Sequence, residues 1–141
     1  MTHIEKQIQR LCREICKMQS DGRCVFCGDP AEAHHLFFDG KHRANWQART
    51  DPDYFTALCG KCHRHAKFAP HVNATKFWKK LAKHIEPKKM CKILDMKYAL
   101  RTFEKPDCKA IHARLVEQYK KLKETHWMDA DIEPEYGRVK P

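Results

Sequence analysis

Residues 24–65 read CVFCGDPAEAHHLFFDGKHRANWQARTDPDYFTALCGKCHRH. A Cys-x2-Cys pair at Cys24 and Cys27 opens this stretch, and a second pair at Cys59 and Cys62 lies near its end. Tetrahedral zinc takes four thiolates at about 2.3 Å, and two such pairs, each placed by one tight turn, can supply them. The spacing therefore predicts a structural Zn²⁺ site that ties the two ends of the stretch together.

Three histidines in the same stretch are not needed by a purely structural zinc site. His34 and His35 lie between the two cysteine pairs, and His63 directly follows the second pair. A neutral imidazole can take a proton from water near neutral pH, because its ordinary pKa is close to 6.5. A divalent metal supplies the Lewis acid that phosphodiester hydrolysis needs. A first strand carrying His34 and His35, opposite a helix carrying His63, would form a pocket for that chemistry.

Length and charge limit the function classes. The 141 residues suit one compact domain with an appended helical part. The chain has 28 Lys and Arg against 18 Asp and Glu, a net charge of +10 and a pI near 9.3, so it should attract polyanions. DNA is the expected partner, although a ribosome-associated or other basic protein would have a similar balance.

Cysteine usage and hydropathy bear on location. The N-terminal residues carry charges throughout and lack the apolar core of a signal peptide. No apolar run approaches 18 residues, so no membrane association is expected. We expect a cytoplasmic protein, or one in the host cytoplasm if it is phage-encoded, where Cys-x2-Cys pairs favour metal over disulfides. The remaining cysteines lie on helical patterns and are expected to be buried free thiols: Cys12, Cys16, Cys91 and Cys108.

Four segments are expected, and together they make an α+β fold. An amphipathic helix occupies 1–20, with apolar residues from Ile4 to Met18 at three- and four-residue steps. Its opposite face is basic and is either a solvated surface or a DNA contact, two interpretations that are compatible. The core at 21–72 should contain a strand at 32–38, a loop at 41–53, a strand at 54–58 and a short helix after Cys59. The terminal helices could pack on this core or pair between chains, so a homodimer and a monomer both stay open.

The segment 73–127 reads as three helices. Thr75 is the expected cap of the first, and Pro87 its stop signal. A second pattern runs from Met90 to about Phe103, and Asp107 should cap the third. The polar residues 128–141 are expected to be an extended or frayed tail.

Four motifs of this chain, taken together, resemble the pattern of the HNH endonucleases. They are Cys24-x2-Cys27, His34-His35, Asp-Pro-Asp at 51–53 and Leu58-Cys59-x2-Cys62-His63. These are the ββα-metal, or His-Me finger, nucleases, and the similarity is to the zinc-knuckle branch that includes phage recombination and junction-cleaving enzymes. The resemblance covers roughly residues 21–81. It implies a small zinc-stapled ββα-metal core between an N-terminal helix and C-terminal helices.

The resemblance also implies roles for individual residues. His35 would be the general base, and His34 and His63 would hold a catalytic divalent metal such as Mg²⁺, Mn²⁺, Zn²⁺ or Ni²⁺. The four cysteines would hold a separate zinc, because a closed thiolate site has no open position for a phosphate. His65 and His71 are either further ligands, as in relatives with three histidines, or surface residues.

One position departs from the family pattern. Tyr54 stands where HNH enzymes usually have the Asn that braces the loop carrying the base. Three interpretations follow: the base is mispositioned, Tyr54 or Asn45 compensates, or the chain is a zinc-stapled module that binds DNA without cutting it. In either functional class, basic residues around the motif are candidates for DNA phosphate contacts: Lys41, Arg43, Arg49, Lys61 and Arg64.

Overall fold

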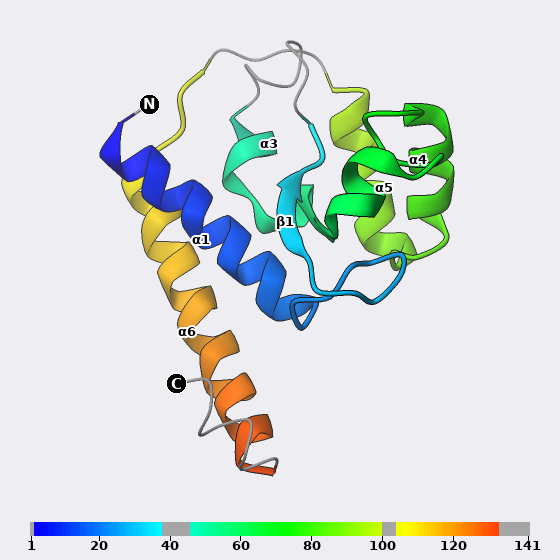
Figure 1. The fold of residues 1–141 in the computed structure, drawn as a ribbon. Coiled ribbons are helices and arrows are strands. Elements are labelled where there is room, and N and C mark those ends of the chain that lie inside the picture. Colours follow the sequence, from blue (N-terminus) through cyan, green and yellow to red (C-terminus); the bar gives the residue numbers. More distant parts are fainter. Residues whose placement is uncertain (1, 38–45, 100–103, 133–141) are drawn as a thin grey trace.

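The computed structural model describes residues 2–37, 46–99 and 104–132. It is an α+β structure, as the sequence predicts, with helices arranged around a two-stranded antiparallel sheet. In Figure 1, α1 and α6 lie side by side on one flank of the sheet, and α4 and α5 lie on the other. Lys41, Arg43 and Asn45, three of the predicted functional residues, lie outside the described residues.

Helix α1 spans His3–Gln19, close to the predicted helix. Thr2 and Glu5 form a capping box, in which each side chain accepts a hydrogen bond from the other residue's backbone N–H. The helix ends where Asp21 and Gly22 adopt positive φ angles of 55° and 68°. Gly22 takes this conformation without the steric cost that a Cβ atom would bring, so the chain can turn into the first cysteine pair.

The sheet consists of β1 (Glu32–His35) and β2 (Phe55–Leu58). His34 lies opposite Thr56 and His35 opposite Phe55 in the antiparallel register. Strand β1 is shorter than the predicted strand at 32–38, because the ladder ends at His35 and the chain bends at Leu36. Consecutive side chains on a strand point to opposite faces, so this register sends the His34 and His35 rings in different directions.

The prediction of a loop throughout 41–53 is wrong for its C-terminal part. Helix α3 spans Gln47–Thr50, and a 3-10 turn, η1, spans Pro52–Tyr54. Ala48 is fully buried, and the Thr50 hydroxyl donates to the Trp46 carbonyl at 2.9 Å. Elements of three and four residues are too short to produce a detectable hydrophobic period, so packing rather than pattern determines them.

A single helical turn, η2 (Lys61–His65), follows the second cysteine pair, where the sequence predicts a short helix. It has π-helical hydrogen bonding, with the Ala66 N–H donating to the Lys61 carbonyl at 2.8 Å. Turns of this type are uncommon and often occur at functional sites. The wide turn places Cys62 inside the fold and His63 at its edge.

The C-terminal helices differ from the prediction at their boundaries. Helix α4 spans Ala74–Ala82 and is capped by Asn73, whose side chain accepts from the Lys76 N–H, and not by Thr75. Pro87 begins α5 (Pro87–Lys97) and does not merely end α4, because proline suits the first helical position. Helix α5 ends at Lys97, before the predicted limit near 103.

Helix α6 spans Cys108–Ile132 and is capped by Asp107, as predicted. It packs along α1 and then continues past it, so its C-terminal part extends away from the sheet (Figure 1). The helix covers residues 128–132, where the sequence predicts an extended tail. None of the described helices is long and apolar enough to cross a bilayer.

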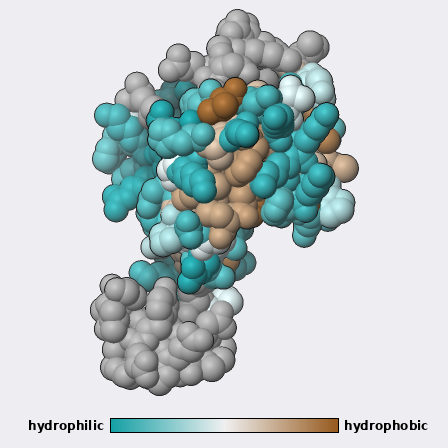
Figure 2. Space-filling view, turned by 45° about the vertical axis from the view of Figure 1, so that its right-hand side comes forward, coloured by the Kyte–Doolittle hydropathy of each residue, from teal (hydrophilic) through white to brown (hydrophobic). Residues whose placement is uncertain are grey.

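Two apolar clusters hold the fold together. Phe55 belongs to the cluster between the sheet, α1 and α6, which also contains Cys12, Cys16 and Cys108. The second cluster joins the cysteine pairs to α4 and α5. Figure 2 shows that one face of the molecule is mostly hydrophilic, with a narrow apolar strip in its middle. Cys91 is exposed, so the prediction of a buried thiol is wrong there and confirmed for the other three.

Candidate metal centres and a charged cleft

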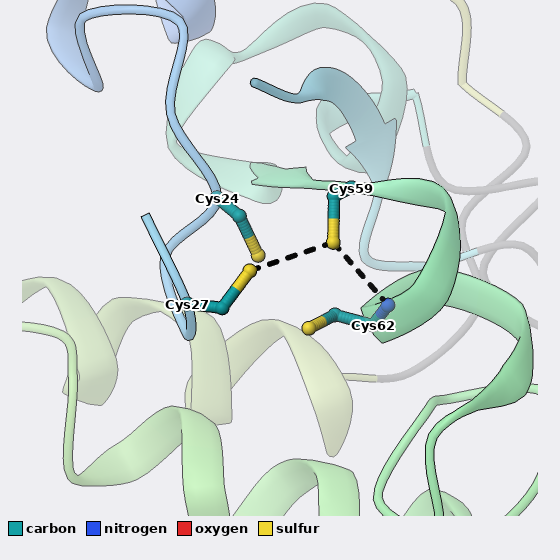
Figure 3. Close-up of side chains that lie close together, drawn as sticks. All are labelled: Cys24, Cys27, Cys59 and Cys62. Carbon is teal, nitrogen blue, oxygen red and sulfur yellow. Dashed lines mark hydrogen bonds between the residues drawn. The ribbon is translucent and has the colours of Figure 1, made fainter. Parts of the chain in front are cut away.

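Cys24, Cys27, Cys59 and Cys62 converge from two turns onto one point (Figure 3). Their sulfur atoms all lie within 4.8 Å of one another, and the Cys27 and Cys59 Sγ atoms are 3.6 Å apart. Four sulfurs at 2.3 Å from a tetrahedral zinc ion would be separated by about 3.8 Å. The donor set, its convergence and its spacing all fit a structural metal ion such as zinc.

Local hydrogen bonds prepare these sulfurs for a cation. The Cys62 N–H donates to Cys59 Sγ at 3.5 Å. Burial opposes ionisation of Cys24, but backbone N–H groups of Cys59, Cys27 and Phe26 stabilise its thiolate and lower its pKa to about 7. Metal binding requires the thiolate form, so this lowered pKa favours occupation at neutral pH.

His34 projects from β1 toward His63 of η2. The two imidazole rings are stacked, with centroids 3.7 Å apart and planes inclined by 18°. Burial lowers the pKa of His34, and a hydrogen bond from its ring to the Leu58 backbone only partly offsets this effect. A histidine that donates one ring N–H to the main chain keeps its other nitrogen for a metal, which is the usual arrangement of histidine ligands.

His71 meets His63 from the other side. The two Nε2 atoms are 3.1 Å apart, and the ring planes are nearly perpendicular at 83°. This separation suits a hydrogen bond between neutral imidazoles, and it is also close to the spacing of about 3.3 Å between two nitrogens on one tetrahedral zinc. Burial, followed by the charges of His34 and His71, lowers the pKa of His63 to about 4.

The ligand atoms of His34, His63 and His71 are not as close together as the sulfur atoms of the four cysteines. Within residues 2–37, 46–99 and 104–132, the cysteines are the only group of three or more His, Cys, Asp or Glu residues whose ligand atoms all lie within 4.8 Å of one another. Of the two alternatives that the sequence left for His71, its contact with His63 favours a role in this site.

His35 lies on the opposite face of β1 from His34. Its ring packs on Phe55 with centroids 4.6 Å apart, and its Nε2 atom is buried with no hydrogen-bond partner among the described residues. Burial, followed by the charges of Arg13 and Arg49, lowers the pKa of His35 to about 4. The imidazole is therefore neutral at physiological pH, as a general base must be.

A cavity of about 550 Å³ opens beside His34 and His63. We call it the histidine cleft. It lies between the end of α1, the strand β1 and the turn η2, and Lys17 and Arg64 contribute positive charge to its walls. Its lining includes Lys17, Glu32, His34, Leu58, His63 and Arg64.

Tyr54 stabilises the end of β1, but through its backbone. Its carbonyl accepts a hydrogen bond from the Leu36 N–H at 2.9 Å, directly after His35. Its ring is 5% exposed and packs against Phe37, with centroids 5.9 Å apart. Burial raises the pKa of the Tyr54 hydroxyl. The side chain is thus part of the core, and it does not open toward the histidine cleft.

A cationic clamp, which the sequence does not predict, holds the segment before β2. Lys92 of α5 donates to Asp51 Oδ2 at 2.7 Å and to Asp53 Oδ2 at 2.9 Å. The Asp51 side chain also accepts from the Asp53 N–H. Lys92 lies about forty residues from both partners along the chain, a separation at which pattern analysis cannot pair side chains.

The predicted phosphate contacts that the structure describes have different environments. Arg49 packs on the Trp46 ring at 4.4 Å, and its Nε atom is buried with no partner among the described residues. The Trp46 ring therefore supports the Arg49 side chain through a cation–π contact. Lys61 and Arg64 both lie on η2 and are exposed.

Comparisons with protein-family models, with curated proteins and with solved structures found no match to this chain.

Proposed function

We propose that this protein is a metal-dependent endonuclease of the HNH type that hydrolyses DNA phosphodiester bonds, with substrates of the phage recombination or junction type. The observation that carries the proposal is the contact of His34 with His63 at the wall of a positively charged cleft. Two strands followed by a helical turn bring these residues together from positions far apart in the chain. This order of elements, with cysteine pairs at its edges, is the one that the HNH resemblance implies.

In the proposed site, different residues bind the divalent cation, the DNA phosphates and the structural zinc. His63, His71 and His34 would hold a divalent cation, which supplies Lewis acidity toward the scissile phosphate and the leaving oxygen. Arg64 at the cleft wall would contact the phosphate backbone. The four cysteines would hold zinc and have a folding role, because a tetrahedral thiolate site has no free coordination position.

His35 is the proposed general base, with a constraint on which nitrogen acts. Its Nε2 atom is enclosed, so Nδ1 is the nitrogen that would take a proton from water. The hydrogen bond from Leu36 N–H to the Tyr54 carbonyl holds the chain directly after His35. Backbone bracing of this kind would supply part of what the Asn of the HNH pattern provides.

A non-catalytic, zinc-stapled DNA-binding module is the second candidate. The orientation of His35 favours it, because β1 sends the His35 ring away from the face on which His34 meets His63. A module of this kind would have the zinc site, the basic charge and the cleft, but it would not hydrolyse DNA.

Nicking of supercoiled plasmid DNA separates the two candidates. Zinc-loaded wild-type protein would be incubated with Mg²⁺, Mn²⁺ or Ni²⁺, beside His35→Ala and the matched control His65→Ala, which changes an exposed histidine in η2. The nuclease proposal expects nicking by the wild type and by His65→Ala and a loss of at least about 100-fold in His35→Ala. Binding without nicking in every metal would instead establish the binding module.

A further inference from the structure

We infer that the C-terminal half of α1 is a phosphate-binding wall of the histidine cleft, with Lys17 as its principal contact and Arg13 as a second. This inference rests on the proposed function and adds a DNA-backbone subsite to it. The expected ligand is the phosphodiester backbone beside the bond that is cut. Of the two interpretations that the sequence leaves open for the basic face of α1, this inference takes the DNA contact and assigns it to particular residues.

The position of Lys17 is the first reason. Its side chain lines the same cavity as His34, His63 and Arg64, although it comes from a different element. Lys17 and Arg64 therefore bring positive charge to the cleft from two different elements, α1 and η2. A phosphate that enters the cleft beside the histidines would be within the field of both cations.

The partner of Lys17 is the second reason. Lys17 Nζ lies 3.2 Å from the Glu32 carboxylate, whose side chain is 73% exposed. Glu32 and His34 are two residues apart on β1, so their side chains project from the same face. The ion pair thus holds the Lys17 ammonium group beside the cleft, and an exposed ion pair of this kind is weak enough to exchange for a phosphate.

Arg13 extends the wall by one helical turn. Residues four apart on a helix are neighbours on its surface, so Arg13 and Lys17 share one side of α1. Arg13 is exposed and open to contact with a polyanion.

Equilibrium binding to a short DNA duplex of arbitrary sequence tests the inference without hydrolysis. The measurements would use zinc-loaded protein in a His35→Gln background across a range of salt concentrations. Each lost phosphate contact should reduce the slope of log K against log salt by about 0.9. We expect that reduction in Lys17→Gln, a larger one in Arg13→Gln/Lys17→Gln, and the original slope in Lys17→Arg.

Two further variants make the test directional. Glu32→Gln removes the negative charge that competes for Lys17, so it should tighten binding, opposite to the effect of Lys17→Gln. Lys121→Gln removes the same charge from an exposed position on the projecting part of α6 and should leave the slope unchanged. Thermal melts of every variant would show that each is folded.

The results separate this inference from the proposed function. If Lys17→Gln keeps the wild-type slope and the wild type nicks DNA, the phosphate wall is overturned and the nuclease proposal stands. A wild type that binds DNA with a Lys17-dependent slope but never nicks it would remove the nuclease and leave the wall. The same slope change in both lysine variants would show a general effect of net charge and would also overturn the inference.

Discussion

The imidazole rings of His34 and His63 lie in nearly parallel planes, with their centroids 3.7 Å apart. A metal ion bound by a histidine lies close to the plane of its ring, along the nitrogen lone pair. Two parallel, stacked rings share no such position, whereas the nearly perpendicular rings of His63 and His71 do. We therefore expect that His63 and His71 form the first half of the divalent site and that His34 joins by turning its ring.

Removal of His71 should weaken the binding of the divalent ion without disrupting the fold. His71 is exposed, and its Nε2 atom is 3.1 Å from that of His63. In His71→Ala we expect affinity for Mn²⁺ or Ni²⁺ to fall by roughly 10- to 100-fold, with nicking restored at saturating metal. His63→Ala should not be restored in this way. Isothermal titration of zinc-loaded protein measures the affinity, and His65→Ala is the control; equal affinities in all three variants would exclude His71 as a ligand.

Loss of one cysteine ligand should abolish zinc binding and destabilise the core. Cys59 lies between β2 and η2, and its sulfur is 3.6 Å from that of Cys27. Because metal binding and folding are coupled in small sites, Cys59→Ser should bind zinc more than about 100-fold more weakly and lose its cooperative thermal transition. Elemental analysis and calorimetry measure both effects. Cys91→Ser, which changes an exposed cysteine outside the cluster, should keep one zinc per chain and the wild-type transition.

The sequence predicts those parts of the fold that local spacing determines. The cysteine pairs, the α1 stripe and the Asp107 cap depend on residues close together in the chain, and each is found near its predicted position. The His63–His71 contact depends on the turn at 66–72, which has no periodic signal. The opposite orientation of His34 and His35 follows from strand alternation, but only after the end of β1 is known.

The contacts of Lys92 with the segment before β2 should contribute modestly to the free energy of unfolding. Lys92→Met removes both of its bonds, to Asp51 and Asp53, but the groups are partly exposed, so we expect a loss of about 1 kcal/mol in unfolding free energy. Urea unfolding of the wild type, Lys92→Met, Asp51→Asn and the double variant forms a double-mutant cycle that measures the coupling between Lys92 and Asp51. Lys88→Met, an exposed lysine on the same helix, should cost less. A coupling near zero would show that the clamp is only a surface contact.

The stability of the protein should fall in acid partly because of His35. The unfolded chain has an ordinary histidine pKa near 6.5, whereas burial lowers the folded value to about 4. Between these values the unfolded state binds the additional proton, so the His35 contribution to unfolding free energy decreases as the pH falls. His35→Asn cannot take up that proton. Urea unfolding at about pH 7.5 and about pH 5.5 should therefore show a larger loss in the wild type than in His35→Asn. Titration of the cysteine site is common to both proteins and cancels in the comparison, so parallel losses would show that His35 keeps an ordinary pKa.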